Sequence, residues 1–317
     1  MIAQGGPNGH SNLFKVTTYT NEIVTDKDFF QYSNIEDFKI KLEELKNTDF
    51  SGFNKKRIGE TIFSFLTVIP SLIGKYAPEK FNQFKFYRVR LNINEDCEDL
   101  RLVRTYSYPL PQFCKENGRA NFQNKSVFYA TNSALTAIIE SKPKVGDIGY
   151  LSIWDGGTDR EMKSGILLPR NLNTENEWYI LAKEAYAFAE KHYDKVAMQK
   201  SNFFHEALNF ISSLFLIEKA PYSITSWISN ELIYGTAWKD FIIYPSFANK
   251  AFTSNFAIHP NVADKYLKFV KVIRFKVLEL GGDKFSLSTG RVGELIQNNI
   301  AWRTATKEEL DFSLFPG

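Results

Sequence analysis

The chain is poor in the residues that build metal sites and disulfide frameworks. Its 317 residues include two cysteines, Cys97 and Cys114, and four scattered histidines. Two cysteines at this spacing match neither a zinc motif nor a disulfide framework, which favours a reducing compartment and a cytoplasmic location. His205 begins a segment like a zinc-protease helix, but Asn209 occupies the position of the second histidine. We therefore expect no metal site and no prosthetic group.

Long apolar runs are also missing. The most apolar segment, residues 58–77, is interrupted by Glu60, Pro70 and Lys75. It falls short of the roughly 20 residues that span a bilayer, so we interpret it as a buried or amphipathic helix. Residues 1–16 show no basic segment followed by an apolar core, so no secretory signal is expected. These features predict a protein with no membrane partner.

Other common signatures are absent as well. A net charge of +3 is too small to indicate nucleic acid as a partner, although it is compatible with an anionic ligand. The Gly-Gly pairs at 156–157 and 281–282 lack the flanking pattern of a phosphate loop or a dinucleotide fingerprint. No serine lies in a Gly-x-Ser-x-Gly elbow. Nucleotide-binding loops and hydrolases of these standard kinds are therefore excluded.

What the sequence does contain is an alternation of helical and strand patterns. Residues 1–80 are interpreted as an N-terminal helical extension, with helices over 35–46 and 58–77. Strand patterns follow at 84–93, 126–130, 241–246 and 270–280, and a helical block covers about 158–233. We expect an α+β fold with a mixed sheet, a main domain over 81–285 and a C-terminal segment over 286–317.

Residues 117–140 combine an arginine turn, an aromatic strand and a single carboxylate. Arg119 lies in a Gly-Arg-x-Asn turn, and residues 126–130 (SVFYA) form a short strand pattern. Asn132 or Ser133 can cap a helix that starts near Ala134 and ends at Glu140. Burying a carboxylate after an uncharged helical segment costs free energy, so Glu140 is a candidate functional residue.

A nucleotide is the ligand that best fits the chemistry of the polar residues in the central region. Arginine donors suit phosphate oxygens, so Arg88 and Arg119 could hold a diphosphate, with Arg90 as a rival for the first role. Tyr129 offers an aromatic face and a hydroxyl for a sugar. Glu140 could stabilise positive charge as a glycosidic bond ionises.

Each of these residues also has a purely structural interpretation. Arg88 could form an ion pair, and Glu140 could be a solvated helix end beside nearby lysines. Tyr129 could be a core aromatic, and Ser246 could be a turn residue after Pro245. Only their occurrence together favours a site.

An ordered set of motifs resembles the RES domain, a family named for its Arg, Glu and Ser. The motifs are FYRVR at 86–90, GRAN at 118–121, SVFYATNSALTAIIE at 126–140 and DFIIYPSFAN at 240–249, and the resemblance runs from about 84 to 280. It implies a fold like that of ADP-ribosyltransferases and the consumption of NAD by a toxin that a neighbouring antitoxin silences. It assigns the catalytic roles to Arg88, Glu140 and Ser246, and the pocket to Arg119, Tyr129 and Asn121. Many members carry Trp where this chain has Ala120.

The leading hypothesis is cleavage of the nicotinamide–ribose bond of NAD, with water or inorganic phosphate as acceptor. Nicotinamide leaves as a neutral ring, so this reaction needs no general acid. NAD is then a substrate, and an antitoxin or regulatory protein is a candidate partner. Transfer of ADP-ribose to a protein and a catalytically silent nucleotide-binding or docking module remain open alternatives, as does a homo-oligomer.

Overall fold

The computed structural model describes residues 32, 34–66, 69–170, 177–193, 198–235, 238–246, 248, 252–281, 284–306 and 309. Within these residues a mixed sheet has the strand order β1 (Leu72–Tyr76), β5 (Met162–Ile166), β6 (Phe241–Pro245), β7 (Ser254–Ile258), β3 (Phe128–Thr131), β2 (Lys85–Leu91), β4 (Ile148–Gly156), β8 (Leu267–Gly281), β9 (Lys284–Ile296) and β10 (Asn299–Thr304). Its neighbours are antiparallel except for β5 and β6, which run parallel. The expected α+β class with a mixed sheet is confirmed.

The central part of the sheet comes from strands that are far apart in the chain. It comprises β2 (Lys85–Leu91), β3 (Phe128–Thr131), β4 (Ile148–Gly156), β6 (Phe241–Pro245) and β7 (Ser254–Ile258). β3 lies between β2 and β7, and β6 pairs with β7. Segments near residues 88, 130, 245 and 255 are therefore brought to neighbouring positions.

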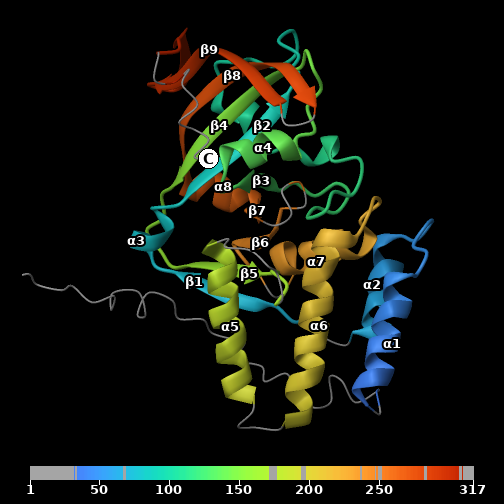
Figure 1. The fold of residues 1–317 in the computed structure, drawn as a ribbon. Coiled ribbons are helices and arrows are strands. Elements are labelled where there is room, and N and C mark those ends of the chain that lie inside the picture. Colours follow the sequence, from blue (N-terminus) through green and yellow to red (C-terminus); the bar gives the residue numbers. More distant parts are fainter. Residues whose placement is uncertain are drawn as a thin grey trace, which may run out of the picture.

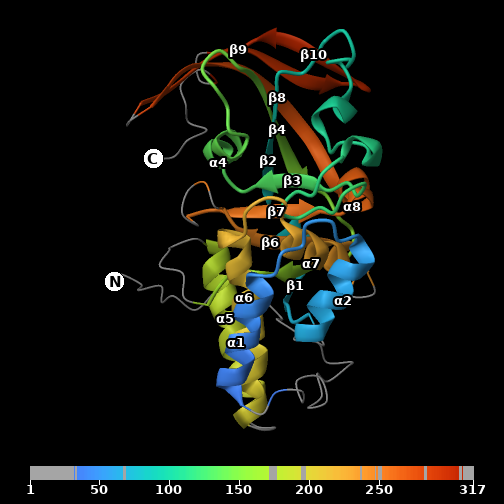
Figure 2. The same cartoon turned by 90° about the vertical axis from the view of Figure 1, so that its right-hand side faces the viewer.

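Helices gather at the β1 end of the sheet, whereas β8 (Leu267–Gly281), β9 (Lys284–Ile296) and β10 (Asn299–Thr304) form the other end (Figures 1 and 2). The helical group comprises α1 (Ile35–Lys46), α2 (Lys55–Phe65), α5 (Glu177–Tyr193), α6 (Met198–Ile217) and α7 (Ser223–Tyr234). Of the block predicted to be helical over about 158–233, α5, α6 and α7 are confirmed as helices, whereas Met162–Ile166 near its start forms strand β5 instead. No helix in the described part of the chain has the length and apolar character needed to cross a bilayer.

The two N-terminal helices form for local reasons and then pack on the helical block. Asn34 caps α1 by accepting a hydrogen bond from the Asp37 N–H, and Phe38, Leu42 and Leu45 form its buried face against α6. α2 packs on α7 at Gly59, where a Cβ atom would lie 2.8 Å from the Trp227 ring. The glycine thus permits the close approach of these two helices.

The predicted helix over residues 58–77 is wrong in its second half. α2 ends at Phe65, and β1 (Leu72–Tyr76) pairs with β5 (Met162–Ile166) at the edge of the sheet. Burial of Leu72, Ile73, Gly74 and Tyr76 reflects packing on both faces of this strand. A short buried strand of this kind has no alternation in its sequence, so periodicity cannot separate it from a buried helix.

The remaining elements complete the frame around the centre of the sheet. α3 (Pro78–Phe81) precedes β2, short 3₁₀ turns occur at Val103–Tyr106 and Pro111–Phe113, and α8 (Pro260–Tyr266) leads into β8. α4 (Ala134–Glu140) packs on β2, β3 and β4. The C-terminal segment contributes β9 and β10 to the same sheet. The sequence had indicated no strand after residue 285.

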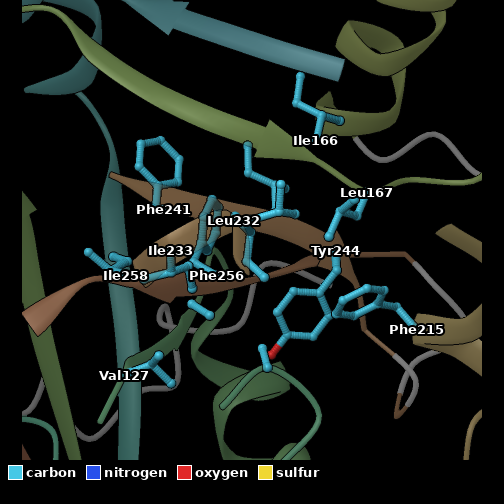
Figure 3. Close-up of a cluster of buried hydrophobic side chains, with 14 of the residues drawn as sticks. Val127, Ile166, Leu167, Phe215, Leu232, Ile233, Phe241, Tyr244, Phe256 and Ile258 are labelled. Carbon is cyan, nitrogen blue, oxygen red and sulfur yellow. The ribbon is translucent and has the colours of Figure 1, made fainter. Parts of the chain in front are cut away.

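Aromatic side chains fill the space between the sheet and α7. Phe241 and Phe256 lie against Leu232 and Ile233, and all four are fully buried or nearly so (Figure 3). Truncating one such phenylalanine to alanine typically costs about 3–5 kcal/mol. At the edge of this cluster the rings of Tyr244 and Phe215 lie 5.1 Å apart (Figure 3). The core therefore fixes β6 and the end of α6 against each other.

Candidate functional site

The sheet opens between β2 and β3. These strands share one register pair, Tyr87 with Thr131, whereas β2 pairs with β4 over its whole length. Beyond that pair the side chain of Arg88 takes the place of the missing ladder, because its Nη1 donates to the backbone carbonyl of Tyr129 at 3.1 Å.

A cavity of about 430 Å³ lies at this opening. Tyr87, Thr131, Asn255 and Tyr244 form a row of paired positions across β2, β3, β7 and β6, and all four line the cavity. Paired positions present their side chains on the same face of a sheet. Glu140 joins them from the end of α4. The volume falls within the range of about 300–1,000 Å³ that is usual for small-molecule sites.

Glu140 is held at one carboxylate oxygen. Ser246 Oγ donates to Glu140 Oε1 at 2.6 Å, and Asn255 Nδ2 donates to the same atom at 2.9 Å. The Ala248 N–H approaches it at 3.5 Å. Among the described residues no hydrogen bond reaches Oε2. One oxygen thus anchors the carboxylate, and the other is left for chemistry in the cavity.

The position of Glu140 is unfavourable for the helix that carries it. Of the two cap candidates in the sequence, Asn132 and Ser133, it is Ser133 that caps α4 by accepting a hydrogen bond from the Thr136 N–H, and the helix ends at Glu140 as predicted. A negative charge at the C-terminal end opposes the helix dipole by about 0.3–1 kcal/mol. The bonds from Ser246 and Asn255 offset this cost, which shows that tertiary structure holds the carboxylate here.

Arg88 faces the cavity without a carboxylate partner among the described residues. Its Nε donates to the Ser107 carbonyl at 3.1 Å, and its guanidinium lies 5.7 Å from the Phe128 ring centre. Burial, with a contribution from the charge of Arg90, lowers the pKa of Arg88 to about 10. The group stays cationic at neutral pH and is available to an anion.

Arg90, the rival candidate, has a structural role. It forms an ion pair with Glu98, with Nη1–Oε2 at 2.5 Å and Nη2–Oε1 at 2.8 Å, and Nη1 also donates to the Thr105 carbonyl at 2.6 Å. Arg90 does not line the cavity. The structure therefore separates two arginines that the sequence could not distinguish.

Arg119 reaches the cavity from the turn before β3. Its Nη1 donates to the Phe215 carbonyl at 2.6 Å, near the C-terminal end of α6, and its guanidinium lies 4.8 Å from the Tyr222 ring centre. Carbonyls in the last turn of a helix have no intrahelical partner and carry partial negative charge. The helical block thus positions this cation on the cavity wall.

The hydroxyl of Tyr129 is used inside the protein, not offered to a ligand. It donates to Asn121 Oδ1 at 2.9 Å and accepts from the Ala120 N–H at 2.8 Å, and burial raises its pKa. The Tyr129 side chain still lines the cavity, whereas Asn121 and Ala120 lie behind it, outside the lining. Ala120 is 1% exposed, so the small residue there belongs to the core.

Gly118 is required by this turn. A Cβ atom at Gly118 would lie 2.3 Å from Asn121 Oδ1 and 2.8 Å from Tyr129 Oη. Both contacts are far below the distances that real side chains adopt. The glycine therefore allows Asn121 and Tyr129 to form the bond that fixes the aromatic wall.

Two functional candidates escaped the sequence analysis. Asn255, the second residue of β7 and 8% exposed, contacts Glu140 directly. Glu218, which directly follows α6, adds a second carboxylate to the cavity lining. The available signal for Asn255 was an asparagine directly before an apolar run (FAI), because asparagine is unfavourable in strands.

Glu218 has a structural partner for each of its oxygens. Its Oε1 accepts from the Ile224 N–H at 2.9 Å and its Oε2 from the Thr225 N–H at 2.8 Å, so it satisfies the start of α7. Burial raises the pKa of Glu218, and these hydrogen bonds together with the charge of Arg119 oppose that shift. We interpret Glu218 as a structural residue that caps the start of α7 and forms part of the cavity wall.

Cations outnumber carboxylates around the cavity. The lining includes Arg88, Arg119, Lys142 and Lys219 against Glu140 and Glu218. This excess attracts an anionic ligand, and arginines are suited to phosphate oxygens. Within the described residues no group of three or more His, Cys, Asp or Glu side chains could hold a metal ion.

Comparison with known proteins identifies no relative of this chain. No protein-family model matches the chain, and neither a curated protein nor a solved structure matches it significantly.

Proposed function

We propose that the protein cleaves the nicotinamide–ribose bond of NAD, with water or inorganic phosphate as the acceptor. The observation that carries the proposal is the convergence of Arg88, Glu140 and Ser246 on one opening of the sheet. These are the residues to which the resemblance to the RES domain assigns the reaction. The fold resemblance to ADP-ribosyltransferases belongs to the same proposal.

The charged residues of the cavity suit two parts of NAD, the diphosphate and the nicotinamide ribose. Arg88 and Arg119 would bind the diphosphate oxygens, and the Tyr129 ring would form the wall beside the nicotinamide ribose. Glu140 Oε2 carries no hydrogen bond among the described residues, so it is available to the positive charge that develops on the ribose. Ser246 would orient that carboxylate.

The proposed reaction needs no general acid. The electron pair of the C1′–N bond passes to the nicotinamide ring nitrogen, which is cationic in NAD and leaves neutral. The oxocarbenium-like ribosyl group is stabilised by Glu140 until an oxygen of water or phosphate forms the new bond at C1′. Water then releases a proton to solvent, and phosphate gives a phosphorylated ADP-ribose.

The test is chromatographic analysis of products after incubation with NAD, with and without phosphate. We expect free nicotinamide from the wild type and a loss of rate of about 100-fold or more in Glu140→Gln, the magnitude typical of removing a group that stabilises transition-state charge. Glu60→Gln is the matched control, because Glu60 is exposed on α2 and its side chain is 63% accessible. Equal NAD loss in wild type and Glu140→Gln would contradict the role of Glu140.

The phosphate arm of this experiment identifies the acceptor, and two further measurements, with labelled NAD and by calorimetry, test the two alternative functions. A product that appears only with phosphate identifies a phosphorylase. Label transferred from NAD to a macromolecule identifies an ADP-ribosyltransferase. Tight NAD binding by calorimetry without any turnover would identify a silent binding module and overturn the proposal.

A further inference from the structure

Asn255 links the carboxylate of Glu140 to the sheet beneath it. Its amide donates to Glu140 Oε1 at 2.9 Å, and both residues line the cavity. We propose that Asn255 is a positioning residue, which holds Glu140 so that Oε2 faces the ribosyl group. This inference rests on the proposed NAD cleavage and adds a residue that the RES motifs do not contain.

The bonds to Glu140 are directional. All three approaches from described residues, by Ser246 Oγ, Asn255 Nδ2 and the Ala248 N–H, end on Oε1. The last torsion of a glutamate side chain is broad, so a carboxylate without such bonds would sample many orientations of its plane. Donors on a single oxygen restrict that rotation. The neighbours of Oε1 thus fix the direction in which the other oxygen points.

Asn255 is well suited to this task because its backbone is already fixed. Its position pairs with Thr131 on one side and Tyr244 on the other, in the interior of the sheet. An asparagine side chain does not stabilise a strand, because asparagine is unfavourable there and its amide must find a hydrogen-bond partner when it is buried. Ser246 lies beyond the end of β6, so Asn255 is the donor built on the more rigid element.

Two substitutions at one position separate positioning from packing. Asn255→Asp keeps the shape but replaces the donor with a second carboxylate against Glu140, whereas Asn255→Ala only removes the donor and leaves a space. If Asn255 positions Glu140, the aspartate variant is the worse enzyme. If it merely fills the sheet, the alanine variant is the worse one, because it loses the packed atoms.

We expect kcat for NAD to fall about 100-fold in Asn255→Asp and about 10-fold in Asn255→Ala, with KM within about 3-fold of the wild type in both. Asn132→Ala is the matched control. Asn132 Oδ1 accepts from the Ser254 N–H at 3.1 Å next to the site, but Asn132 does not line the cavity. This control should keep the wild-type kcat.

The outcomes distinguish the two proposals. If the wild type leaves NAD intact, the proposed function fails and the assignment of Asn255 falls with it. If the wild type consumes NAD and Asn255→Asp matches it, or is impaired less than Asn255→Ala, only the assignment of Asn255 fails. Should Asn255→Asp not fold, a rise in KM without a fall in kcat in Asn255→Ala overturns the assignment by itself.

Discussion

Ser246 Oγ and Glu140 Oε1 lie 2.6 Å apart although 106 positions separate the two residues in the chain. Ser246 is fully buried immediately after β6, and its N–H is bound to the Thr253 carbonyl at 3.0 Å. The backbone that carries the hydroxyl is therefore held in place, and the hydroxyl donates to a charged acceptor. Hydrogen bonds to charged groups contribute about 1.5–3 kcal/mol, more than those between neutral groups.

Removal of this hydroxyl tests its effect on the reaction. In Ser246→Ala we expect kcat for NAD to fall about 10-fold with little change in KM, because Asn255 still holds Glu140 Oε1. Steady-state kinetics provides the measurement. Ser229→Ala is the control, since Ser229 is equally buried but its Oγ has no hydrogen-bond partner in the described structure. A Ser246→Ala enzyme with wild-type kcat would exclude an orienting role.

The two neighbouring arginines of β2 should respond differently to the same substitution. Arg88→Met removes a cation from the cavity, so we expect KM for NAD to rise about 10-fold or more. Arg90→Met breaks a partly exposed ion pair with Glu98, so we expect a stability loss of about 1 kcal/mol and a nearly unchanged KM. Kinetics and urea unfolding of both variants check this. The reverse pattern would show that Arg90 binds the substrate.

Lys239 gives the fold a predictable dependence on pH. It is 3% exposed, and burial lowers its pKa to about 8 from the ordinary 10.5. Between these two values the unfolded chain binds the proton and the folded chain does not, so the contribution of Lys239 to stability rises with pH. Below pH 8 the buried charge lowers the stability of the folded state.

Lys239→Met should therefore be more stable than the wild type at pH 7, by about 1–3 kcal/mol. The difference should shrink as the pH increases from 8 towards 10.5, which urea unfolding at several pH values measures. Lys56→Met, at a site where the side chain is 86% accessible, should differ from the wild type by the same small amount at each pH. A gain in stability of Lys239→Met that is the same at every pH would contradict the lowered pKa of Lys239.

Local signals in the sequence predicted the elements around the site closely. The polar residue before Ala134 and the apolar run to Glu140 predicted α4 with both of its ends, and the alternation in FKFYRVRLNI predicted β2. These elements follow from capping and periodicity, which depend on neighbouring residues alone. β1 was missed because its burial on both faces comes from distant partners.

The candidate site was predictable only in part, because some of its residues carry local signals and others depend on distant partners. The sequence indicated Arg88, Arg119, Tyr129, Glu140 and Ser246, and the structure brings the first four to the cavity lining with Ser246 behind Glu140. Asn121 lies outside the lining, because its side chain supports Tyr129. Asn255 and Glu218 could not be assigned, since their positions depend on strand order and on the packing of the helical block.

The single register pair between β2 and β3 makes the sheet two five-stranded units that meet beside Arg88. One unit is β1-β5-β6-β7-β3 and the other is β2-β4-β8-β9-β10. A ligand that contacts Arg88 from β2 and the Tyr129 wall from β3 spans this junction. Occupancy of the cavity would then couple the unfolding of the two units, so that amide hydrogens on both sides of the junction exchange as one cooperative group.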